Sequence, residues 1–477
     1  IRLSLVGSEM CIRDRYYAGS YTSLSQLNGV APTRTWILKT NERGRADLTK
    51  DSFVSGDDFY YNLTGDPIVP AGALTIQETK GPDGYLIDNT VYFRQVPSDT
   101  SGMEDLNVYN EPVVREQVIR GGVKVAKLDH ETGSDTPQGN ATLSGAVFDI
   151  YNRNDGAVMV GGKSYAKDTV VCTLTTGEDG TAATANNLLP YGDYEIVERT
   201  PPTGYTGDGV VKRTFSIEEN GVIVDLTDAD HAIRNEVIRG GVKVAKRDNE
   251  TGKLEPQGDA TLSGAVFAIY NRSQHPVLVD GELYENGEIV HTLTTGADYT
   301  ATTSADLLPY GTYEIREQTS PTGYLPEGEL NRVFSIREDG VIVDMTGENE
   351  AIRNDVIRGD LMGVKVADGS LNRLANVPFR LTLNATGESH VLMTDENGQF
   401  STASSWNPHS QNTNRGESPL DGVWFGDMDA LDDSKGALPY GRYTLEELPC
   451  EANEGMELLK FTVSVSVSYT HLRAHET

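Results

Sequence analysis

The sequence predicts an all-β protein built from tandem β-sandwich modules, and three observations support this prediction. The 477-residue chain repeats itself at a fixed offset. Apolar and polar residues alternate over short segments, and this period of two is typical of half-buried strands. Turns rich in Gly, Asn, Asp and Pro separate the segments, and no long stretch has the 3.6-residue period of a helix.

The repeat has a period of 119 residues. VIRGGVKVAK occurs at residues 118–127 and again at 237–246, and 237 − 118 gives 119. The same offset relates ATLSGAVF at 141 and 260, LLPYG at 188 and 307, and AIRN at 232 and 351. A period of this length is a whole domain, long enough to bury a core of its own.

Incomplete copies flank the two complete ones, which gives four modules. Module 1 (residues 16–117) lacks an opening GVKVAK strand, and modules 2 (118–236) and 3 (237–355) are complete. Module 4 (356–466) opens with GVKVAD but stops before any AIRN-like closing strand. We therefore expect the first strand of module 1 and the last strand of module 4 to be missing.

The two ends of the chain differ from the sequence between them. Residues 5–14 read LVGSEMCIRD and residues 467–477 read VSYTHLRAHET. Both strings resemble translated sequencing adapter. We therefore predict that residues 1–15 and 467–477 are artefacts and that any anchoring signal lies outside this fragment.

Composition excludes several classes of function. The formal net charge is −31, which disfavours binding to nucleic acid or to an anionic membrane surface. No apolar run approaches the roughly 18 residues of a membrane span. Three Cys and eight scattered His give neither a disulfide scaffold nor a metal motif, and the acidic stretch at 426–433 lacks the EF-hand order. We expect no metal and no cofactor.

The order of motifs in one module resembles a known family. GVKVAK, LSGAVF, a TTGEDG turn, PYGxYEIxE followed by PxGY, and a closing strand with Asn are similar to SpaA-type (Cna B-type, prealbumin-like) domains of Gram-positive pilins and surface adhesins. The resemblance implies inverse-immunoglobulin β-sandwiches. It also implies a spontaneous Lys–Asn isopeptide bond that a buried acid assists.

The resemblance transfers to this chain residue by residue. It implies bonds Lys124–Asn235 and Lys243–Asn354, assisted by Glu198 and Glu317. The Lys-to-Glu spacing is 74 and the Lys-to-Asn spacing is 111 in both modules. The equivalents in the partial modules are Glu78 and a candidate Asn110 in module 1, and Lys365 and Glu447 in module 4.

Lys127 and Lys246 are rival nucleophiles on the opposite strand face. Alternation prevents both lysines of one regular strand from facing the core. Module 4 reads GVKVAD, which keeps Lys365 and places Asp368 at the rival position. This comparison favours the first lysine of each motif, Lys124 and Lys243.

The favoured function is a structural stalk of an extracellular, cell-wall-attached protein, with neighbouring modules of the same chain as partners. An adhesin that binds host extracellular matrix or a glycan through its loops, or a pilus shaft subunit, is the alternative. The irregular insertion at 401–427, with Trp406 and Trp424, is the loop to test for such binding, although packing of its aromatics into the core is favoured. No paired catalytic carboxylates are evident, so we expect no enzyme beyond single-turnover self-cross-linking.

Overall fold

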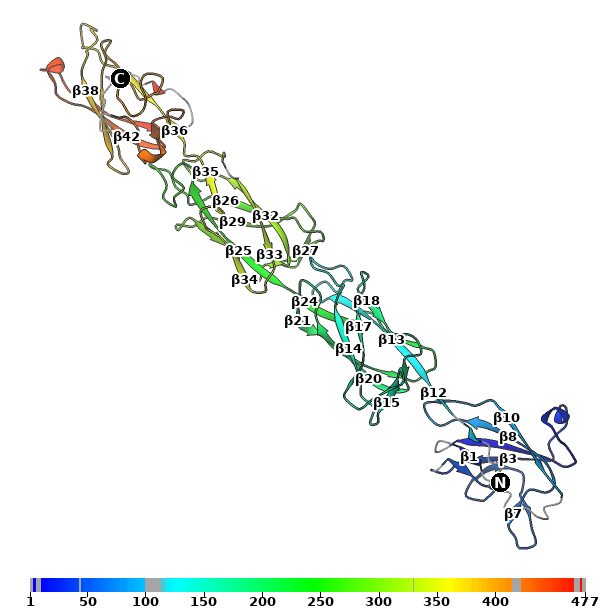
Figure 1. Ribbon diagram of the computed structural model, residues 1–477. Coiled ribbons are helices and arrows are strands. Elements are labelled where there is room, and N and C mark those ends of the chain that lie inside the picture. Colours follow the sequence, from blue (N-terminus) through cyan, green and yellow to red (C-terminus); the bar gives the residue numbers. More distant parts are fainter. Residues whose placement is uncertain are drawn as a thin grey trace. The chain divides into compact units, whose positions relative to one another are not determined.

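The computed structural model describes residues 3–5, 10–42, 44–98, 113–114, 116–328, 330–413, 422–466 and 472–473. Regular structure in these residues is β strand apart from short 3₁₀ turns, which confirms the predicted all-β class (Figure 1). Two compact units are present: residues 1–128, 143–201 and 209–234, and residues 129–142, 202–208 and 235–477. The described residues include no helix long and apolar enough to cross a membrane.

Module 3 lies entirely in the second unit and consists of two sheets and a hairpin. In the first sheet, β25 (Arg239–Asp248) pairs antiparallel with β30 (Thr300–Thr302) and β31 (Leu308–Pro309), and parallel with β34 (Val341–Met345) and β35 (Ile352–Asn354). The second sheet is antiparallel, in the order β29 (Ile289–Thr294), β26 (Val266–Asn271), β32 (Gly311–Thr319) and β33 (Asn331–Ile336). The hairpin joins β27 (Val277–Val279) to β28 (Glu282–Tyr284).

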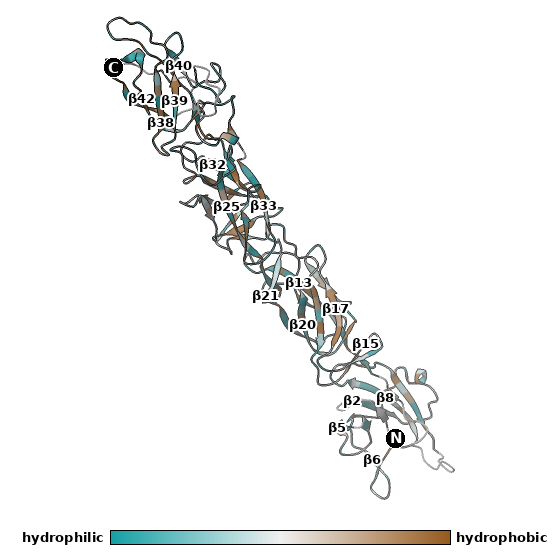
Figure 2. Ribbon diagram, turned by 60° about the vertical axis from the view of Figure 1, so that its left-hand side comes forward, coloured by the Kyte–Doolittle hydropathy of each residue, from teal (hydrophilic) through white to brown (hydrophobic). Residues whose placement is uncertain are grey.

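The period of two in the sequence decides which side chains of module 3 are buried. Val242 and Val244 on β25 are fully buried, and so are Tyr313 and Ile315 on β32. Both sheets contribute to one apolar cluster, and strands in Figure 2 change between brown and teal along their length. Each fully buried aliphatic side chain contributes about 1.5–3 kcal/mol to stability.

Module 2 follows the same plan. β13 (Arg120–Asp129) pairs antiparallel with β18 (Thr181–Ala183) and β19 (Leu189–Pro190), and parallel with β23 (Ile223–Leu226). The second sheet has the order β17 (Val170–Thr175), β14 (Val147–Asn152), β20 (Gly192–Thr200) and β22 (Lys212–Ile217). The remaining strands are β15 (Val158–Val160), β16 (Lys163–Tyr165), β21 (Tyr205–Val210) and β24 (Ile233–Val237).

Module 1 keeps the second sheet but has a much reduced first sheet. Its larger sheet has the order β10 (Val91–Val96), β8 (Gly72–Lys80), β2 (Cys11–Tyr17), β3 (Arg34–Lys39) and β5 (Phe53–Gly56). A three-residue strand, β1 (Leu3–Leu5), pairs parallel with β11 (Val113–Val114) and antiparallel with β4 (Arg45–Ala46). The other elements are η1 (Leu24–Leu27), β6 (Tyr60–Tyr61), β7 (Pro67–Ile68), β9 (Tyr85–Leu86) and β12 (Gln117–Val118).

Residues 10–15, which we expected to lie outside the fold, form part of this sheet. Met10 and Ile12 are buried in the apolar core of module 1. Asp14 pairs with Ile76 across the strands, at the place where Ile269 of module 3 pairs with Ile315. An acid at this core position is unfavourable because burial disfavours its charged form. The adapter origin of these residues stays a prediction.

Module 4 has a complete second sheet and a short first sheet. The second sheet has the order β39 (Ser389–Met393), β38 (Pro378–Leu383), β42 (Gly441–Glu447) and β43 (Lys460–Val465). In the first, β37 (Leu361–Val364) pairs with β40 (Gln399–Ser401) and parallel with β44 (Leu472–Arg473), and β36 (Arg358–Gly359) pairs with β41 (Leu438–Pro439). Two 3₁₀ turns complete the module, η3 (Met428–Ala430) and η4 (Glu451–Asn453). β44 lies within the segment that resembles adapter.

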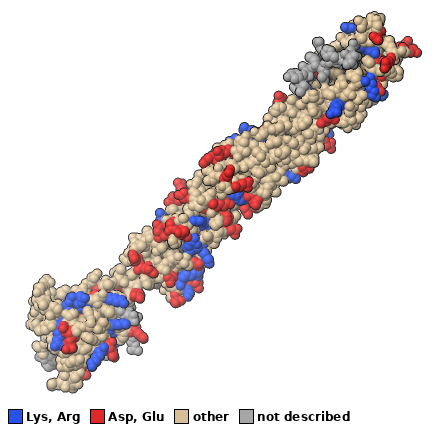
Figure 3. Space-filling view, turned by 180° about the vertical axis from the view of Figure 1, so that it is seen from behind, with Lys and Arg blue, Asp and Glu red and all other residues tan. Residues whose placement is uncertain are grey.

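Charged side chains of both signs lie on the face that Figure 3 shows. On the face that Figure 3 shows, Asp and Glu are scattered along the surface with Lys and Arg among them. That face has no continuous cationic stripe of the kind that tracks a phosphate backbone.

Candidate functional site

Lys246, Glu317 and Asn354 come from three strands of module 3 and lie together in its interior. Lys246 and Asn354 are fully buried, and the Glu317 side chain is 2% exposed. Lys246 Nζ lies 3.4 Å from Glu317 Oε1. Asn354 Nδ2 donates a hydrogen bond to Glu317 Oε2 at 2.8 Å. The carboxyl group therefore lies between the amine and the carboxamide.

Strand alternation brings these residues to one core. On β25, Lys246 follows Val242 and Val244 at every second position, so all three face inward. On β32, Glu317 follows Ile315 in the same way, and a β-bulge between Val266 and Phe267 of β26 accompanies it. Bulges are common beside functional groups because they re-aim a side chain.

Burial controls the charge of the lysine. The pKa of Lys246 falls from its usual value of 10.5 to about 8, because burial disfavours the ammonium form. The negative charges of Glu317 and Asp248 oppose this effect. A useful fraction of the neutral, nucleophilic amine is therefore accessible near neutral pH.

The carboxamide of Asn354 is held by its nitrogen. Nδ2 donates to Glu317 Oε2 and also to the main-chain oxygen of Glu327 at 3.2 Å. Asn354 Oδ1 is buried and accepts no hydrogen bond from the described residues. The NH₂ group, which must leave if the amide is attacked, is thus the group that contacts the acid.

Lys243 and Lys124, the lysines favoured from the sequence, do not reach this site. Each is half-buried on the outer face of its strand, and parallel pairing sets Lys243 opposite Asp344 and Lys124 opposite Asp225. The structure therefore does not place the first lysine of either motif beside the buried glutamate. Geometry favours Lys246 over Lys243 because Lys246 shares the core face with the buried valines.

Two signals in the sequence could have led to the second lysine. Val123 and Val125 already mark the core face of β13, and alternation from them reaches Lys127. The 119-residue period carries Lys127 to Lys246 and then to Lys365. Module 4 has three extra residues before GVKVAD, so matching that motif directly misaligned Lys365 with the first lysine.

Module 2 has the same amine and acid. Lys127 Nζ lies 3.4 Å from Glu198 Oε1, with side-chain exposures of 0% and 2%. Asn235, at the position of Asn354, is fully buried on β24, and its Nδ2 donates to the main-chain oxygen of Asp208 at 3.4 Å. The distances between lysine and acid in modules 2 and 3 agree.

Module 1 has the acid without the amine. Glu78 is buried on β8 and accepts the main-chain N–H of Asp88 at 2.6 Å. The candidate Asn110 lies outside the described residues. The 119-residue period instead puts Glu116 at the position of Asn235. Burial, followed by the charges of Glu78 and Asp88, raises the pKa of Glu116 to about 7.

Module 4 retains the amine and the acid. Lys365 Nζ lies 3.0 Å from Glu447 Oε2, and the side chains are 7% and 0% exposed. The described part of the module contains no strand that corresponds to β35 of module 3.

Packing of the insertion's aromatic residues into the core, which the sequence analysis favoured, holds for Trp424 but not for Trp406. Trp424 is fully buried, and the guanidinium of Arg358 lies 3.7 Å from the centre of one of its rings. Trp406 is 36% exposed. The loop thus covers an arginine at the start of the module instead of offering both tryptophans to a ligand.

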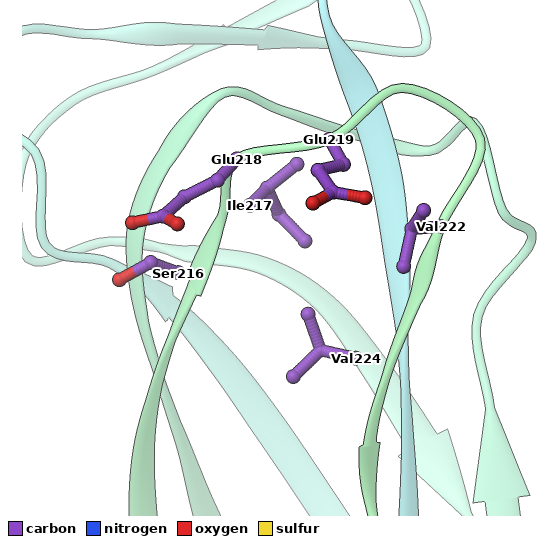
Figure 4. Close-up of a pocket in the computed structure, with 6 residues that line it drawn as sticks. All are labelled: Ser216, Ile217, Glu218, Glu219, Val222 and Val224. Atoms are coloured by element: carbon purple, nitrogen blue, oxygen red, sulfur yellow. The ribbon is translucent and has the colours of Figure 1, made fainter.

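Metal sites and pockets elsewhere in the described residues have less structural support than the Lys246–Glu317–Asn354 site. Among the described residues, no three His, Cys, Asp or Glu converge as metal ligands. Figure 4 shows a small hollow of about 170 Å³ at the β22–β23 turn, lined by Ser216, Ile217, Glu218, Glu219, Val222 and Val224. Its serine donates to Asp193 at 2.6 Å, so the hydroxyl is not paired with a general base such as histidine.

Comparison with known proteins identifies the repeated module. Residues 121–230 and 240–351 match the family model SpaA, described as a prealbumin-like fold domain. The two matches cover most of modules 2 and 3. This confirms the resemblance seen in their motifs. No curated protein matches the chain at a significant level.

Solved structures similar to the chain include the following three. The Bacillus anthracis TIE protein is 18% identical, with 96% of this chain and 67% of that chain covered and a TM-score of 0.44. A streptococcal ancillary pilin is 18% identical (74% and 98% covered, TM-score 0.22). BcpA, the major pilin subunit of Bacillus cereus, is 16% identical (73% and 95% covered, TM-score 0.26). The fold assignment rests on the two SpaA matches.

Proposed function

We propose that this chain is part of the structural stalk of a Gram-positive cell-surface protein, and that its SpaA domains are cross-linked by self-formed Lys–Asn amide bonds. The observation that supports this most directly is the buried set of Lys246, Glu317 and Asn354 in module 3. The expected bonds are Lys246–Asn354 and Lys127–Asn235, in place of bonds from Lys243 and Lys124.

The chemistry needs each of the three residue types. An ammonium cannot attack a carboxamide, so Lys246 must first lose a proton to solvent, and its lowered pKa makes this loss easier. The neutral amine then adds to Cγ of Asn354. Glu317 takes a proton from the attacking nitrogen and passes it to Nδ2, which it already contacts at 2.8 Å, and ammonia leaves. One C–N bond forms and one breaks, so each domain reacts once.

The cross-link would stabilise the domain against unfolding and pulling. It closes a chain segment of 108 residues (354 − 246). By the loop-entropy relation for disulfides, such a closure is worth about 4.7 kcal/mol. An amide cannot be reduced, and force that enters through β25 would leave through a covalent bond to β35. These properties suit a load-bearing surface module.

Intact mass of the full chain tests the proposal. Each bond releases ammonia, so modules 2 and 3 together should lower the mass by about 34 Da relative to the sequence. Glu317→Ala should lose one of these cross-links, and Lys243→Arg, the matched control, should lose none. A mass equal to that of the unmodified sequence would overturn the proposal.

A further inference from the structure

The amine–acid–amide contacts of module 3 recur in module 4 with an asparagine from a different element. Asn453 is 2% exposed and lies in η4, in the loop between β42 and β43. Its Nδ2 donates to Glu447 Oε1 at 3.0 Å, while Lys365 Nζ contacts Glu447 Oε2 at 3.0 Å. As in module 3, one carboxyl oxygen holds the amine and the other holds the amide NH₂.

The remaining contacts of the two asparagines also correspond. Asn453 Nδ2 makes a second bond to the main-chain oxygen of Leu448 at 2.9 Å, as Asn354 does to that of Glu327 at 3.2 Å. Asn453 has one contact that Asn354 does not have among the described residues. The main-chain N–H of Cys450 donates to Asn453 Oδ1 at 2.7 Å. A donor on this oxygen would stabilise the oxyanion that forms when Cγ is attacked.

The asparagine is specific to module 4. It stands six residues after Glu447, and the residues six positions after Glu198 and Glu317 are Gly204 and Gly323. The η4 turn holds the loop over the acid, and the N–H of Leu459 also donates to Glu447 Oε2 at 3.1 Å. Burial and these bonds fix Asn453 beside the Lys365–Glu447 pair without any contribution from a closing strand.

We propose that module 4 forms its own amide cross-link, between Lys365 and Asn453. The inference rests on the chemistry proposed for module 3 but assigns a different bond. Once Lys365 Nζ has lost its ammonium proton to solvent, the neutral amine adds to Cγ of Asn453, Glu447 passes a proton from the attacking nitrogen to Nδ2, and the Cγ–Nδ2 bond breaks. Ammonia leaves, and the new amide joins the end of β37 to the loop after β42.

Tryptic digestion of the full chain, followed by mass spectrometry, tests this bond. The cross-link would join peptide 359–373, uncut after Lys365, to peptide 443–460, with a mass about 17 Da below the sum of the two peptides. Lys365→Arg keeps a cation beside Glu447 and should abolish the branched peptide. Asn384→Ala, which changes a nearby asparagine that pairs with Thr444, should leave it intact.

The outcomes separate the two proposals. Free peptides 359–365 and 443–460 would overturn the module 4 bond, and so would Lys365 joined to any other asparagine. The peptides of module 3 are read in the same digest. If the Lys246–Asn354 bond is present and the Lys365–Asn453 bond is absent, the module 4 inference alone fails. If neither bond is present, the proposed chemistry fails as well.

Discussion

Modules 3 and 1 contain the same antiparallel sheet and the same buried glutamate, but different groups face that glutamate. In module 3, Glu317 contacts Lys246 and the amide of Asn354. In module 1, Glu78 receives a main-chain N–H and lies near Glu116, and burial is the main cause that raises its pKa. The three lysines of module 1, Lys39, Lys50 and Lys80, are all exposed.

The difference shows what the lysine does before any reaction. A buried carboxyl keeps its charge only where the fold supplies a cation, and otherwise it holds its proton to higher pH. The lysine-bearing strand therefore provides both a counter-charge and a nucleophile. Module 1 has a sandwich sheet without this reactive pair.

Removal of the lysine from module 3 should have the largest effect. Lys246→Ala eliminates the cross-link and leaves Glu317 buried without a cation, so we expect a loss of at least about 4–5 kcal/mol in the free energy of unfolding of module 3. Calorimetry of the full chain measures this. Lys243→Ala is the matched control and should cost less than about 1 kcal/mol, because it removes one partly exposed cross-strand pair. Equal losses for the two variants would contradict the site.

Module 1 should lose stability as pH rises, although its larger sheet resembles the second sheet of module 3. Burial raises the pKa of Asp14 from 3.8 to about 7. Because the pKa of Asp14 is higher in the folded state, protonated Asp14 contributes fully to the stability of module 1 below about pH 4. This contribution is lost as pH rises through 7. The loss approaches 4 kcal/mol for a shift of about three pKa units. Hydrogen exchange of β2 and β8 amides, with module 3 amides as internal reference, measures it.

Asp14→Leu provides the control for this effect. It places an apolar residue at the position that corresponds to Ile269 and should raise the stability of module 1 at pH 7, while reducing the pH dependence to the part that Glu78 and Glu116 contribute. Unchanged protection factors between pH 4 and 7 in the unmodified chain would show that Asp14 is not the buried acid described here.

The arginines that open the modules extend the comparison. Arg358 donates to Glu250 of module 3, and both side chains are 3% exposed. Arg120 follows module 1, makes similar bonds to main-chain oxygens, and has no carboxylate partner among the described residues. Arg358→Ala should therefore destabilise its surroundings by about 3 kcal/mol in denaturant unfolding, and Arg120→Ala by less than about 1. Similar losses would mean that Glu250 is not what distinguishes the two positions.

The smallest predicted effect concerns the rate of bond formation. Because the pKa of Lys246 is about 8, the neutral amine becomes about tenfold more abundant for each pH unit between 6 and 8. The cross-linking rate of module 3 after refolding, followed by mass, should rise accordingly and level off above 8. A rate that does not change with pH would indicate that the proton passes within the Lys246–Glu317 pair without exchange with solvent.

Much of the fold could be predicted because it depends on local patterns. Alternation and turn residues gave the strands, and the 119-residue repeat gave modules 2 and 3. The position of Asn354 and Glu317 followed from motifs that both complete modules share. The sequence analysis favoured Lys243, which the structure does not bring to Glu317, because the motif GVKVAD was weighed above alternation from Val242 and Val244.

Other features depend on contacts that sequence spacing does not encode. Residues 10–14 belong to a string that resembles sequencing adapter, yet Ile12 and its neighbours form β2, a central strand between β8 and β3. Modules 2 and 3 have glycine at the position of Asn453, so no repeat pointed to it. Its place beside Glu447 is set by the η4 turn, which is a tertiary feature.

Peptide mapping of module 3 in the full chain tests the Lys246–Asn354 cross-link most directly. We predict a branched tryptic peptide in which peptide 244–247, uncut after Lys246, is joined to peptide 354–358. Its mass should be about 17 Da below the sum of the masses of the two peptides. A free peptide 244–246 together with a free peptide 354–358 would contradict the claim. A branch at Lys243 would contradict the assignment of the lysine.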